Sequence, residues 1–584
     1  MSHIYQQFRL HVLNAVSQLQ SQQFLPDSLS LDAITAEPPR EVTHGDIATN
    51  AALVLAGQAK KKPRDIADAL AEILRSAPDV IDVQIAGAGF INLRLNESVF
   101  LRHIPKILNE DTRYGDSEIG KASKVNVEYV SANPTGPLHV GHARGAVVGD
   151  ALANLLIKAG YEVTREYYIN DAGAQVDKVA QSAYLRYREA CGETIDEMPE
   201  GLYPGEYMKI AGEAIKARYG TDLLAANKET WLPICKEIAI AAMLNLIKED
   251  LSELGIHHDI FTSEAALHAD KKIEDAIETL ATQGLIYRGI LEPPKGKKPE
   301  EWEARQQLLF RATAHGDDVD RPVQKSDGSF TYFAADLALA NDKIRRGFTS
   351  QVLILGADHG GYVKRLQAAV SALSNKKCAC DVLLCQLVHL YQNGEPFKMS
   401  KRAGTFVTVS DVLDAVGKDI LRFIMLTRKS DMVIDFDLDK VKEQSKDNPV
   451  FYVQYAHARV YSLLRLAETE QPDAVTQSLS PTPAMLALLT HPVELSLLKK
   501  LAQWTRVIEQ AALSREPHRI AFYVQELAAE FHGMWNLGHK EFELRFIVND
   551  APELTAARLA LARCLAIVIA SGLLVCGVTP VREL

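Results

Sequence analysis

Two histidines, His139 and His142, stand three residues apart in the segment SANPTGPLHVGHARG, residues 131–145. If a helix starts here, both imidazoles lie on one face of its first turn. There they can donate hydrogen bonds to oxygens that gain charge during phosphoryl transfer. Gly136 and Gly141 let the backbone approach a bulky ligand, and the N–H groups of a helix N-terminus favour phosphate. The segment predicts a nucleotide site, although two loop histidines without a role would show the same spacing.

A second group of candidate residues lies far downstream, in FKMSKRAGTFV. Lys398, Lys401 and Arg402 stand together, with Ser400 among them and Gly404 after them. Three cations and a hydroxyl on a glycine-ended loop suit a clamp on pyrophosphate. Alone, such a run is an ordinary charged surface. Together with the histidine pair, it predicts that two distant segments converge on one triphosphate.

The segments around the histidine pair predict the elements that position it. KVNVEYV (124–130) alternates like a strand, apolar residues then recur at helical spacing up to Gly160, and YEVTREYYI (161–169) predicts the next strand. Strand, helix and strand of this size form a βαβ unit, which implies a parallel sheet. Such sheets bind ligands at the carboxyl ends of their strands, where this helix begins.

The whole chain predicts an α/β protein of several domains, because 584 residues exceed what one hydrophobic core supports. Strand-like SQVLILGADHGG and CDVLLCQLVHL continue the parallel sheet after a long helical stretch. We expect an N-terminal α+β domain at 1–115 and a catalytic domain at 116–439. A helical region at about 172–290 is expected to be inserted in the catalytic domain, and an all-α domain to follow at 440–584.

Composition indicates a globular protein of the reducing cytoplasm. Hydrophobic residues make up 47% of the chain and charged residues 24%. The seven cysteines are odd in number and include no CxxC pair, which argues against a disulfide scaffold and a four-ligand zinc site. The N-terminus has no secretory pattern, and the uncharged run CLAIVIASGLLVCG is shorter than the roughly 20 residues of a bilayer span. We expect that run to form a buried helix ending near Gly577.

Net charge is −11, which by itself argues against a nucleic-acid partner because phosphate contacts need cations. A large protein can still carry a local basic groove under a negative total charge. Charge therefore leaves a nucleic-acid partner open.

The motifs resemble those of class I aminoacyl-tRNA synthetases. HVGH is similar to the HIGH signature, with Val140 in place of isoleucine, and Lys398 to Arg402 reproduces KMSKR. Further segments resemble arginyl-tRNA synthetases, among them YYINDAGAQV, TYFAADLA, LGADHGGYVKRLQAA and NPVFYVQYAHARV. The resemblance covers the chain from end to end. It implies a Rossmann-type catalytic domain, an N-terminal additional tRNA-binding domain and a C-terminal helical anticodon-binding domain.

The resemblance also implies the reaction and its participants. L-arginine and ATP would form arginyl-adenylate and pyrophosphate, and the arginyl group would pass to the 3′-terminal adenosine of tRNA(Arg) with release of AMP. His139, His142, Lys398 and Lys401 would act on the phosphates. Mg²⁺ would accompany ATP through phosphate and water, without a protein metal site. Contacts to ATP would come from Gly136, Gly141, Gly356, Asp358, His359, Met399 and Ser400.

The arginine pocket and the anticodon contacts follow from the same resemblance. A planar guanidinium requires carboxylates, which Glu128 and Asp336 would supply beside Tyr332, while Ser131 and Asn133 would hold the ammonium and carboxylate groups. Without the resemblance, Tyr332 and Asp336 would be an ordinary i,i+4 surface pair. The residues expected to read the anticodon are Tyr452, Gln454, Tyr455, His457 and Arg459. The same residues at helical spacing could equally belong to the hydrophobic core.

Three alternatives remain open from the sequence. The same class of enzyme could charge another amino acid, lysine being nearest in charge. A nucleotidyltransferase of the same fold could use a small-molecule acceptor, although it would have no anticodon for the helical C-terminal region to read. A non-catalytic RNA-binding relative would be expected to lose the histidines or lysines. We expect a cytoplasmic monomer without a membrane partner, whose arginine activation needs bound tRNA.

Overall fold

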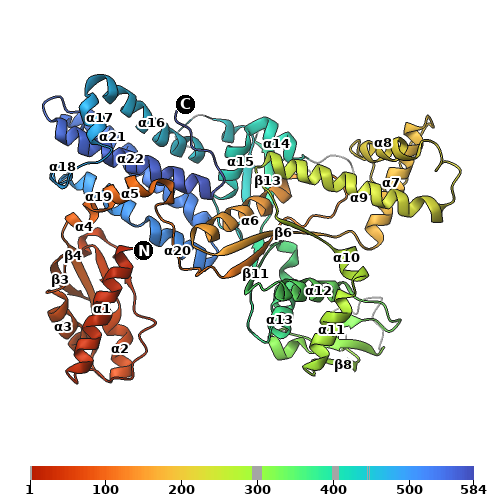
Figure 1. Ribbon diagram of the computed structural model, residues 1–584, viewed down its shortest axis with the longest axis horizontal. Coiled ribbons are helices and arrows are strands. Elements are labelled where there is room, and N and C mark those ends of the chain that lie inside the picture. Colours follow the sequence, from red (N-terminus) through yellow and green to blue (C-terminus); the bar gives the residue numbers. More distant parts are fainter. Residues whose placement is uncertain (1–2, 292–304, 393, 397–406, 444, 446–447) are drawn as a thin grey trace.

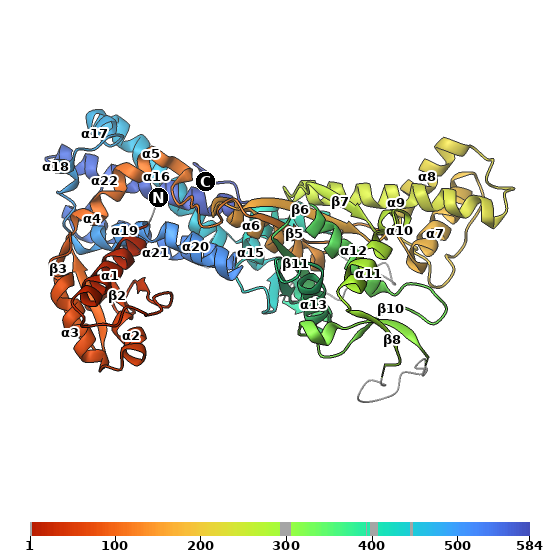
Figure 2. The same cartoon turned by 60° about the horizontal axis from the view of Figure 1, so that its bottom comes forward.

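A five-stranded parallel sheet, in the order β12-β11-β5-β6-β7, lies at the centre of the molecule (Figures 1 and 2). This arrangement confirms the predicted α/β fold. The computed structural model describes residues 3–291, 305–392, 394–396, 407–443, 445 and 448–584. The strands of the central sheet are β5 Lys124–Glu128, β6 Glu162–Ile169, β7 Ile260–Ser263, β11 Ser350–Gly356 and β12 Ala379–Cys385.

Helix α6 (Val140–Lys158) is the crossover between β5 and β6 and begins at the histidine pair. Most of its residues are buried, because it packs against the central sheet on one side and against C-terminal helices on the other. The helix ends before Gly160, whose φ of 84° is a left-handed conformation that glycine adopts without strain. The predicted strand, helix and strand are therefore confirmed.

Three helices fill the connection between β6 and β7 and project at one end of the molecule (Figure 1). They share a hydrophobic core of their own. They are α7 Ala174–Ala190, α8 Met208–Tyr219 and α9 Lys228–Glu253.

The sequence predicts a helical region at about 172–290, but the structure shows that this region also contains strands. Strand β7 joins the central sheet, and β8 joins a three-stranded antiparallel sheet. These strands are four residues long, and hydrophobic period over so short a stretch does not distinguish a strand from a loop. The small sheet contains β8 Ile286–Gly289, β9 Gln307–Phe310 and β10 Arg321–Gln324, and beside it lie α10 Glu264–Ala269, α11 Lys272–Thr282, α12 Tyr332–Arg345 and α13 Val363–Leu373.

The N-terminal region is a four-stranded antiparallel sheet, in the order β1-β2-β4-β3, covered by helices. It lies beside the C-terminal helices although the two regions are at opposite ends of the sequence (Figure 1). Trp504 Nε1 donates a hydrogen bond to the Tyr114 carbonyl at 3.0 Å, which ties the two regions together. The elements are α1 Ile4–Ser21, β1 Ala36–Glu37, β2 Ile47–Thr49, α2 Ala51–Ala59, α3 Pro63–Leu74, β3 Val80–Ala86, β4 Phe90–Leu95, α4 Ser98–Leu101 and α5 His103–Glu110.

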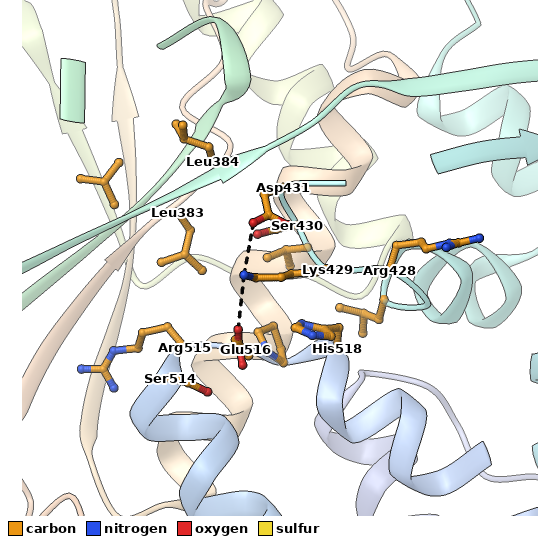
Figure 3. A pocket seen from close by; sticks show the side chains of 14 residues that line it. Leu383, Leu384, Arg428, Lys429, Ser430, Asp431, Ser514, Arg515, Glu516 and His518 are labelled. Atoms are coloured by element: carbon orange, nitrogen blue, oxygen red, sulfur yellow. Dashed lines mark ion pairs between the residues drawn. The ribbon is translucent and has the colours of Figure 1, made fainter. Parts of the chain in front are cut away.

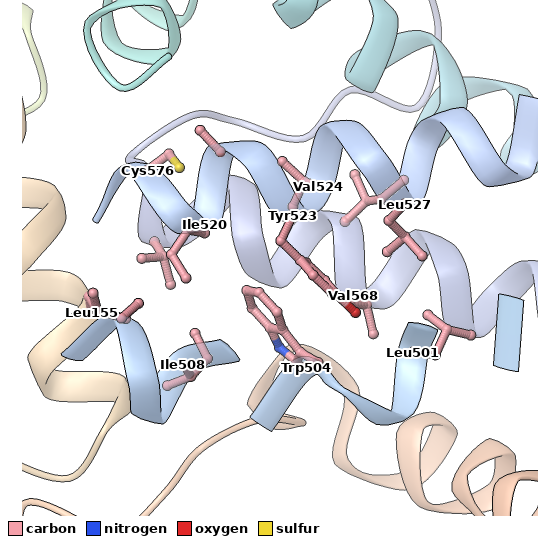
Figure 4. Close-up of a cluster of buried hydrophobic side chains, with 14 of the residues drawn as sticks. Leu155, Leu501, Trp504, Ile508, Ile520, Tyr523, Val524, Leu527, Val568 and Cys576 are labelled. Atoms are coloured by element: carbon pink, nitrogen blue, oxygen red, sulfur yellow. The ribbon is translucent and has the colours of Figure 1, made fainter. Parts of the chain in front are cut away.

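The C-terminal region is helical, and its core is continuous with that of α6. Figure 4 shows Leu155 of α6 facing Ile508, Trp504 and Ile520, with Val568 of the last helix behind them. The expected buried helix near the C-terminus is confirmed as part of α22. The helices are α16 Pro449–Glu470, α17 Pro472–Gln477, α18 Pro483–Leu486, α19 Pro492–Ala502, α20 Trp504–Ser514, α21 His518–Lys540 and α22 Pro552–Val575.

Helices α9 and α22 are, among the described residues, long and apolar enough to cross a membrane. The most apolar stretch of α22 has 78% of its residues buried inside the protein, as expected for a core helix. For α9 the buried share is 28%. The length and composition of α9 and α22 are therefore weak evidence that either helix crosses a membrane.

The central sheet and the C-terminal helices are joined by charged groups. Figure 3 shows Lys429 between Asp431 and Glu516, with Nζ–O distances of 3.2 and 3.6 Å, in a cavity of 310 Å³. Arg422 is fully buried and forms an ion pair with Asp150 of α6. The connecting elements are β13 Val388–Gln392, β14 Glu395–Pro396, α14 Val409–Val416, α15 Lys418–Met425 and β15 Ile434–Asp437.

Candidate active site

The predicted histidine pair lies at the N-terminus of α6. His139 is the N-cap, and its ring stacks on that of His142 with centroids 3.7 Å apart and an interplanar angle of 18°. The His139 backbone N–H donates to His142 Nδ1 at 3.3 Å. A Cβ added at Gly141 would lie 2.9 Å from the His139 ring, so this glycine makes room for the ring. The sequence therefore places both imidazoles at the positive end of the helix.

The backbone before this turn is strained. Val130 and Ser131 have φ values of 68° and 39°, and a β-branched residue in this region is an outlier. Such conformations persist only where the surroundings fix them, and they cluster at functional sites. Here Ser131 Oγ accepts from the Tyr168 N–H at 3.1 Å and donates to Glu128 Oε1 at 3.3 Å. The strain therefore aims Ser131 across the ends of β5 and β6.

The segment that follows the lysine-rich motif returns to the histidine turn. Val140 N–H donates to the Val407 carbonyl at 3.2 Å, and Val409 N–H donates to the Leu138 carbonyl at 2.9 Å. His139 and Thr408 form the bridge between these bonds. The stem of the predicted loop therefore lies beside the histidine pair. The motif residues themselves, Lys398, Met399, Ser400, Lys401, Arg402 and Gly404, lie outside the described residues.

Four of the five residues predicted to bind arginine line one cavity of 270 Å³. Glu128 lies at the end of β5, and Tyr332 and Asp336 lie one turn apart at the start of α12. Tyr332 stands at the rim with 77% of its surface exposed. Asn133 does not line the cavity and donates from Nδ2 to Gln175 Oε1 at 2.9 Å. The four that meet are Glu128, Ser131, Tyr332 and Asp336.

The cavity is strongly acidic. Burial, followed by the negative charges of Glu128 and Glu264, raises the pKa of Asp336 to about 7. Burial also raises the pKa of Glu264, which receives a hydrogen bond from Tyr168. A cationic ligand would favour the ionised form of these carboxyl groups, because an opposite charge stabilises it. The cavity is thus prepared for a cation.

Several residues of this cavity were not predicted. Lys343 of α12 is buried and forms an ion pair with Glu128 Oε2, so one carboxylate already has a cationic partner. Glu264 and Tyr168 come from β7–α10 and β6. Lys343 lies 11 positions after Tyr332, on the same helix, and could have been found by extending the predicted helix face. Glu264 carries no local signal.

The predicted nucleoside segment lies at the end of β11, next to β5. Gly356, Asp358 and His359 are exposed, and His359 Nδ1 lies 3.1 Å from Asp358 Oδ1. His359 also lines the acidic cavity. At Gly136, on the other side of the histidine turn, an added Cβ would lie 2.8 Å from the Tyr207 ring. The histidine turn follows β5, and the predicted nucleoside segment follows β11. Because the two strands are parallel neighbours, both segments lie at the same, carboxyl-terminal edge of the sheet.

The residues predicted to read RNA divide into two sets on α16. Tyr455 is 39% exposed, and the Arg459 guanidinium lies 4.3 Å from the centre of its ring and 4.9 Å from that of Trp535. Tyr452 is half-buried against His532, with ring centroids 4.6 Å apart. Tyr455 and Arg459 offer the stacked aromatic and cationic surface that a splayed base requires.

Gln454 and His457 were expected to contact RNA, but their side chains face the interior of the protein. Both are buried, at 4% and 2% exposure. Gln454 Nε2 donates to the Thr579 carbonyl at 2.7 Å, and His457 Nδ1 lies 2.6 Å from the Val581 carbonyl. These side chains hold the C-terminal segment on α16, because they lie on the helix face opposite Tyr455. In this structure they do not present polar groups to RNA.

Comparisons with known families agree with this geometry. Residues 103–462 match the model described as tRNA synthetases class I (R), catalytic domain. Residues 6–95 match the arginyl tRNA synthetase N terminal domain, and residues 453–584 match the DALR anticodon binding domain. Fold and site together define a class I aminoacyl-tRNA synthetase.

Relatives narrow the class further. The chain is 56% identical over 560 residues to an arginine–tRNA ligase of Cereibacter sphaeroides, covering 96% of each protein. It is 54% identical over 581 residues to that of Roseobacter denitrificans, covering 100% of each. A Thermus thermophilus arginyl-tRNA synthetase structure shares the fold, with a TM-score of 0.70 at 21% identity over 99% of this chain and 100% of that one. The chain belongs to the arginyl-tRNA synthetase family, the arginine–tRNA ligases.

Proposed function

We propose that the acidic cavity and the histidine turn form one site, in which L-arginine reacts with ATP and is then transferred to tRNA(Arg). The observation that carries this proposal is the pairing of 138–140 with 407–409, beside a cavity lined by carboxylates. It supports a common cleft for the histidines and the lysine-rich motif. Val407 lies six positions after Lys401 in the sequence, a chain length of at most about 22 Å.

In the first step the arginine carboxylate attacks the α-phosphorus of ATP, and pyrophosphate leaves. Phosphoryl transfer needs mainly positioning and charge stabilisation from the protein. His139 and His142 would donate hydrogen bonds to phosphate oxygens, and Lys398 and Lys401 would neutralise the leaving pyrophosphate. Gly136, Gly141, Gly356 and the Asp358–His359 pair would leave room for the nucleoside, with Met399 and Ser400 on the closing loop.

Arginine would enter the cavity with its guanidinium between Asp336 and Glu128. The Tyr332 hydroxyl would stand at the rim, and Ser131 would face the ammonium end. Asn133 would reach the substrate only after exchanging its Gln175 partner. A lysine ammonium cannot make the paired hydrogen bonds of a guanidinium, which costs about 1–3 kcal/mol for each buried partner left unsatisfied.

Mg²⁺ is proposed to arrive with ATP, where it would neutralise phosphate charge. Among the described residues, no group of three or more His, Cys, Asp or Glu side chains is placed to hold a metal ion. Phosphate oxygens and water would supply its ligands, because Mg²⁺ usually keeps several waters and binds through substrate phosphates. The residues of the chain would act on the nucleotide itself.

In the second step, the 2′- or 3′-hydroxyl of the terminal adenosine attacks the arginyl carbonyl, and AMP leaves. Tyr455 and Arg459 are proposed to hold an anticodon base by stacking, with Tyr452 beside them. The enzyme is further proposed to act as a cytoplasmic monomer, in keeping with its seven free cysteines. Light scattering of the purified chain measures the mass in solution.

One assay tests the proposal. Isotope exchange between pyrophosphate and ATP is measured with arginine or lysine, each with and without tRNA(Arg). We expect exchange only with arginine and tRNA together. Exchange with lysine would contradict the specificity, and no exchange under any condition would contradict the proposed activity.

A further inference from the structure

A buried carboxylate lies directly behind the histidine turn. Asp250, near the end of α9, accepts the Leu138 backbone N–H at 2.6 Å through Oδ2. Asp250 is 7% exposed and Leu138 is fully buried. A hydrogen bond to an ionised carboxylate is shorter and about twice as strong as one between neutral groups. This contact joins the three-helix insertion to the residue immediately before His139.

The same residue is also held through its carbonyl. The Leu138 carbonyl accepts from Val409, the first residue of α14, and Val140, two positions further along the chain, donates to the Val407 carbonyl. Leu138 is therefore fixed by α9 through its N–H and by the stem of the lysine-rich loop through its carbonyl. His139 lies between these bonds, and its backbone in turn contacts His142.

The surroundings of Asp250 disfavour the ionised form of its carboxyl group. Burial raises its pKa to about 6, and the backbone N–H of Leu138 opposes this rise. Glu253, Glu249 and Asp411 all add negative charge. A carboxyl group placed among other acids does not serve stability through its charge. A positional role accounts for it, since among the described residues the Leu138 hydrogen bond is the interaction that favours its ionised form.

We propose that Asp250 is a positioning residue for the phosphate site, fixing the backbone of Leu138, on which the histidine turn and the stem of the lysine-rich loop are aligned. This inference rests on the proposed function. Arginine binds to a different set of residues, at the ends of β5, β6 and α12. Loss of the Asp250 contact should therefore slow activation and weaken ATP binding, without changing arginine binding.

The test compares three variants of the full chain. Asp250→Ala removes the acceptor, Asp250→Asn keeps a neutral acceptor of the same shape, and Glu253→Gln makes the same charge change on an exposed residue of the same helix. tRNA-dependent pyrophosphate exchange gives kcat and the KM values for ATP and arginine. Amide hydrogen exchange, read by mass spectrometry, follows peptides that contain Leu138 and Val409.

We expect Asp250→Ala to lower kcat/KM for ATP tenfold or more, because a shift of about 1 Å at a reacting group can cost a hundredfold. The KM for arginine should stay within twofold. Asp250→Asn should recover activity to within threefold of the wild type, and Glu253→Gln should match the wild type. Amide exchange at Leu138 and Val409 should rise in both Asp250 variants, more in Asp250→Ala.

Three results would overturn the inference. These are Asp250→Ala indistinguishable from Glu253→Gln, Asp250→Asn as impaired as Asp250→Ala, or a rise in arginine KM parallel to the loss of kcat. If Asp250→Ala does not fold, the amide exchange rates at Leu138 and Val409 in Asp250→Asn test the inference. Amide exchange rates equal to those of Glu253→Gln would contradict a positioning role of the Asp250–Leu138 contact. A wild-type protein without arginine-dependent activity would refute the proposed function. The amide hydrogen-exchange comparison would still test whether Asp250 fixes the backbone at Leu138.

Discussion

Arginine binding should depend on pH through one carboxyl group, Asp336. Its pKa is raised to about 7, first by burial and then by Glu128 and Glu264. A guanidinium beside it favours the ionised form, so the pKa of Asp336 falls when arginine binds. Below pH 7 the free site holds a proton that must leave before the ion pair forms. Arginine affinity should therefore fall as the pH drops below 7.

The magnitude follows from the titration of a single group. With a pKa of about 7, Asp336 is roughly 10% ionised at pH 6 and roughly 90% ionised at pH 8. Arginine should thus bind about tenfold more weakly at pH 6 than at pH 8, and binding should release close to one proton at pH 6. The carboxylate of free arginine stays ionised throughout this window.

Isothermal titration calorimetry measures both quantities when it is repeated in buffers of different ionisation enthalpy. Asp336→Asn should bind arginine weakly and without this pH dependence. Glu264→Gln removes one of the charges that raise the pKa, so the midpoint should move to lower pH. An affinity that is constant between pH 6 and pH 8, or the same pH dependence in Asp336→Asn, would refute the reasoning.

Further substitutions test three other parts of the structure. His142→Ala should slow pyrophosphate exchange by a factor on the order of 10², because a donor to the developing charge is lost, while tRNA affinity in a filter-binding assay stays unchanged. Equal losses in both would indicate a structural role. Arg422→Met leaves Asp150 buried without its main partner and should lower the free energy of unfolding by about 3 kcal/mol in urea titrations. Replacing Asp150 by leucine in the same chain should recover part of that loss, and an unchanged midpoint in the single variant would contradict the account. Tyr455→Ala should weaken tRNA binding by ~1–3 kcal/mol. Gln454→Ala should instead speed amide exchange at residues 579–581 with tRNA affinity unchanged, and the reverse pattern would return Gln454 to the RNA-binding surface.

Local pattern was enough to predict the central βαβ unit and its site. The apolar period of α6, the strand before it and the glycine after it are all encoded within about 50 residues, and each follows from local chain geometry. The stacked histidines at the helix start follow from the same segment. Tyr332 and Asp336 could be paired because four residues make one helical turn, provided that the segment is a helix.

Contacts between distant segments could not be predicted in this way. The Asp250–Leu138 bond joins positions 112 apart, and the Lys343–Glu128 pair joins positions 215 apart. Gln454 and Tyr455 are neighbours in sequence, yet one faces the C-terminal segment and the other faces solvent.

The sequence by itself determined the class of chemistry, because two short motifs carry the groups that are proposed to contact phosphate. Only the tertiary structure decided the charge state of the acidic cavity and the support of the histidine turn. A pKa depends on burial and on every nearby charge, and these are set when remote strands and helices pack together. Local periodicity records which face of an element is buried, but it does not record what that face meets.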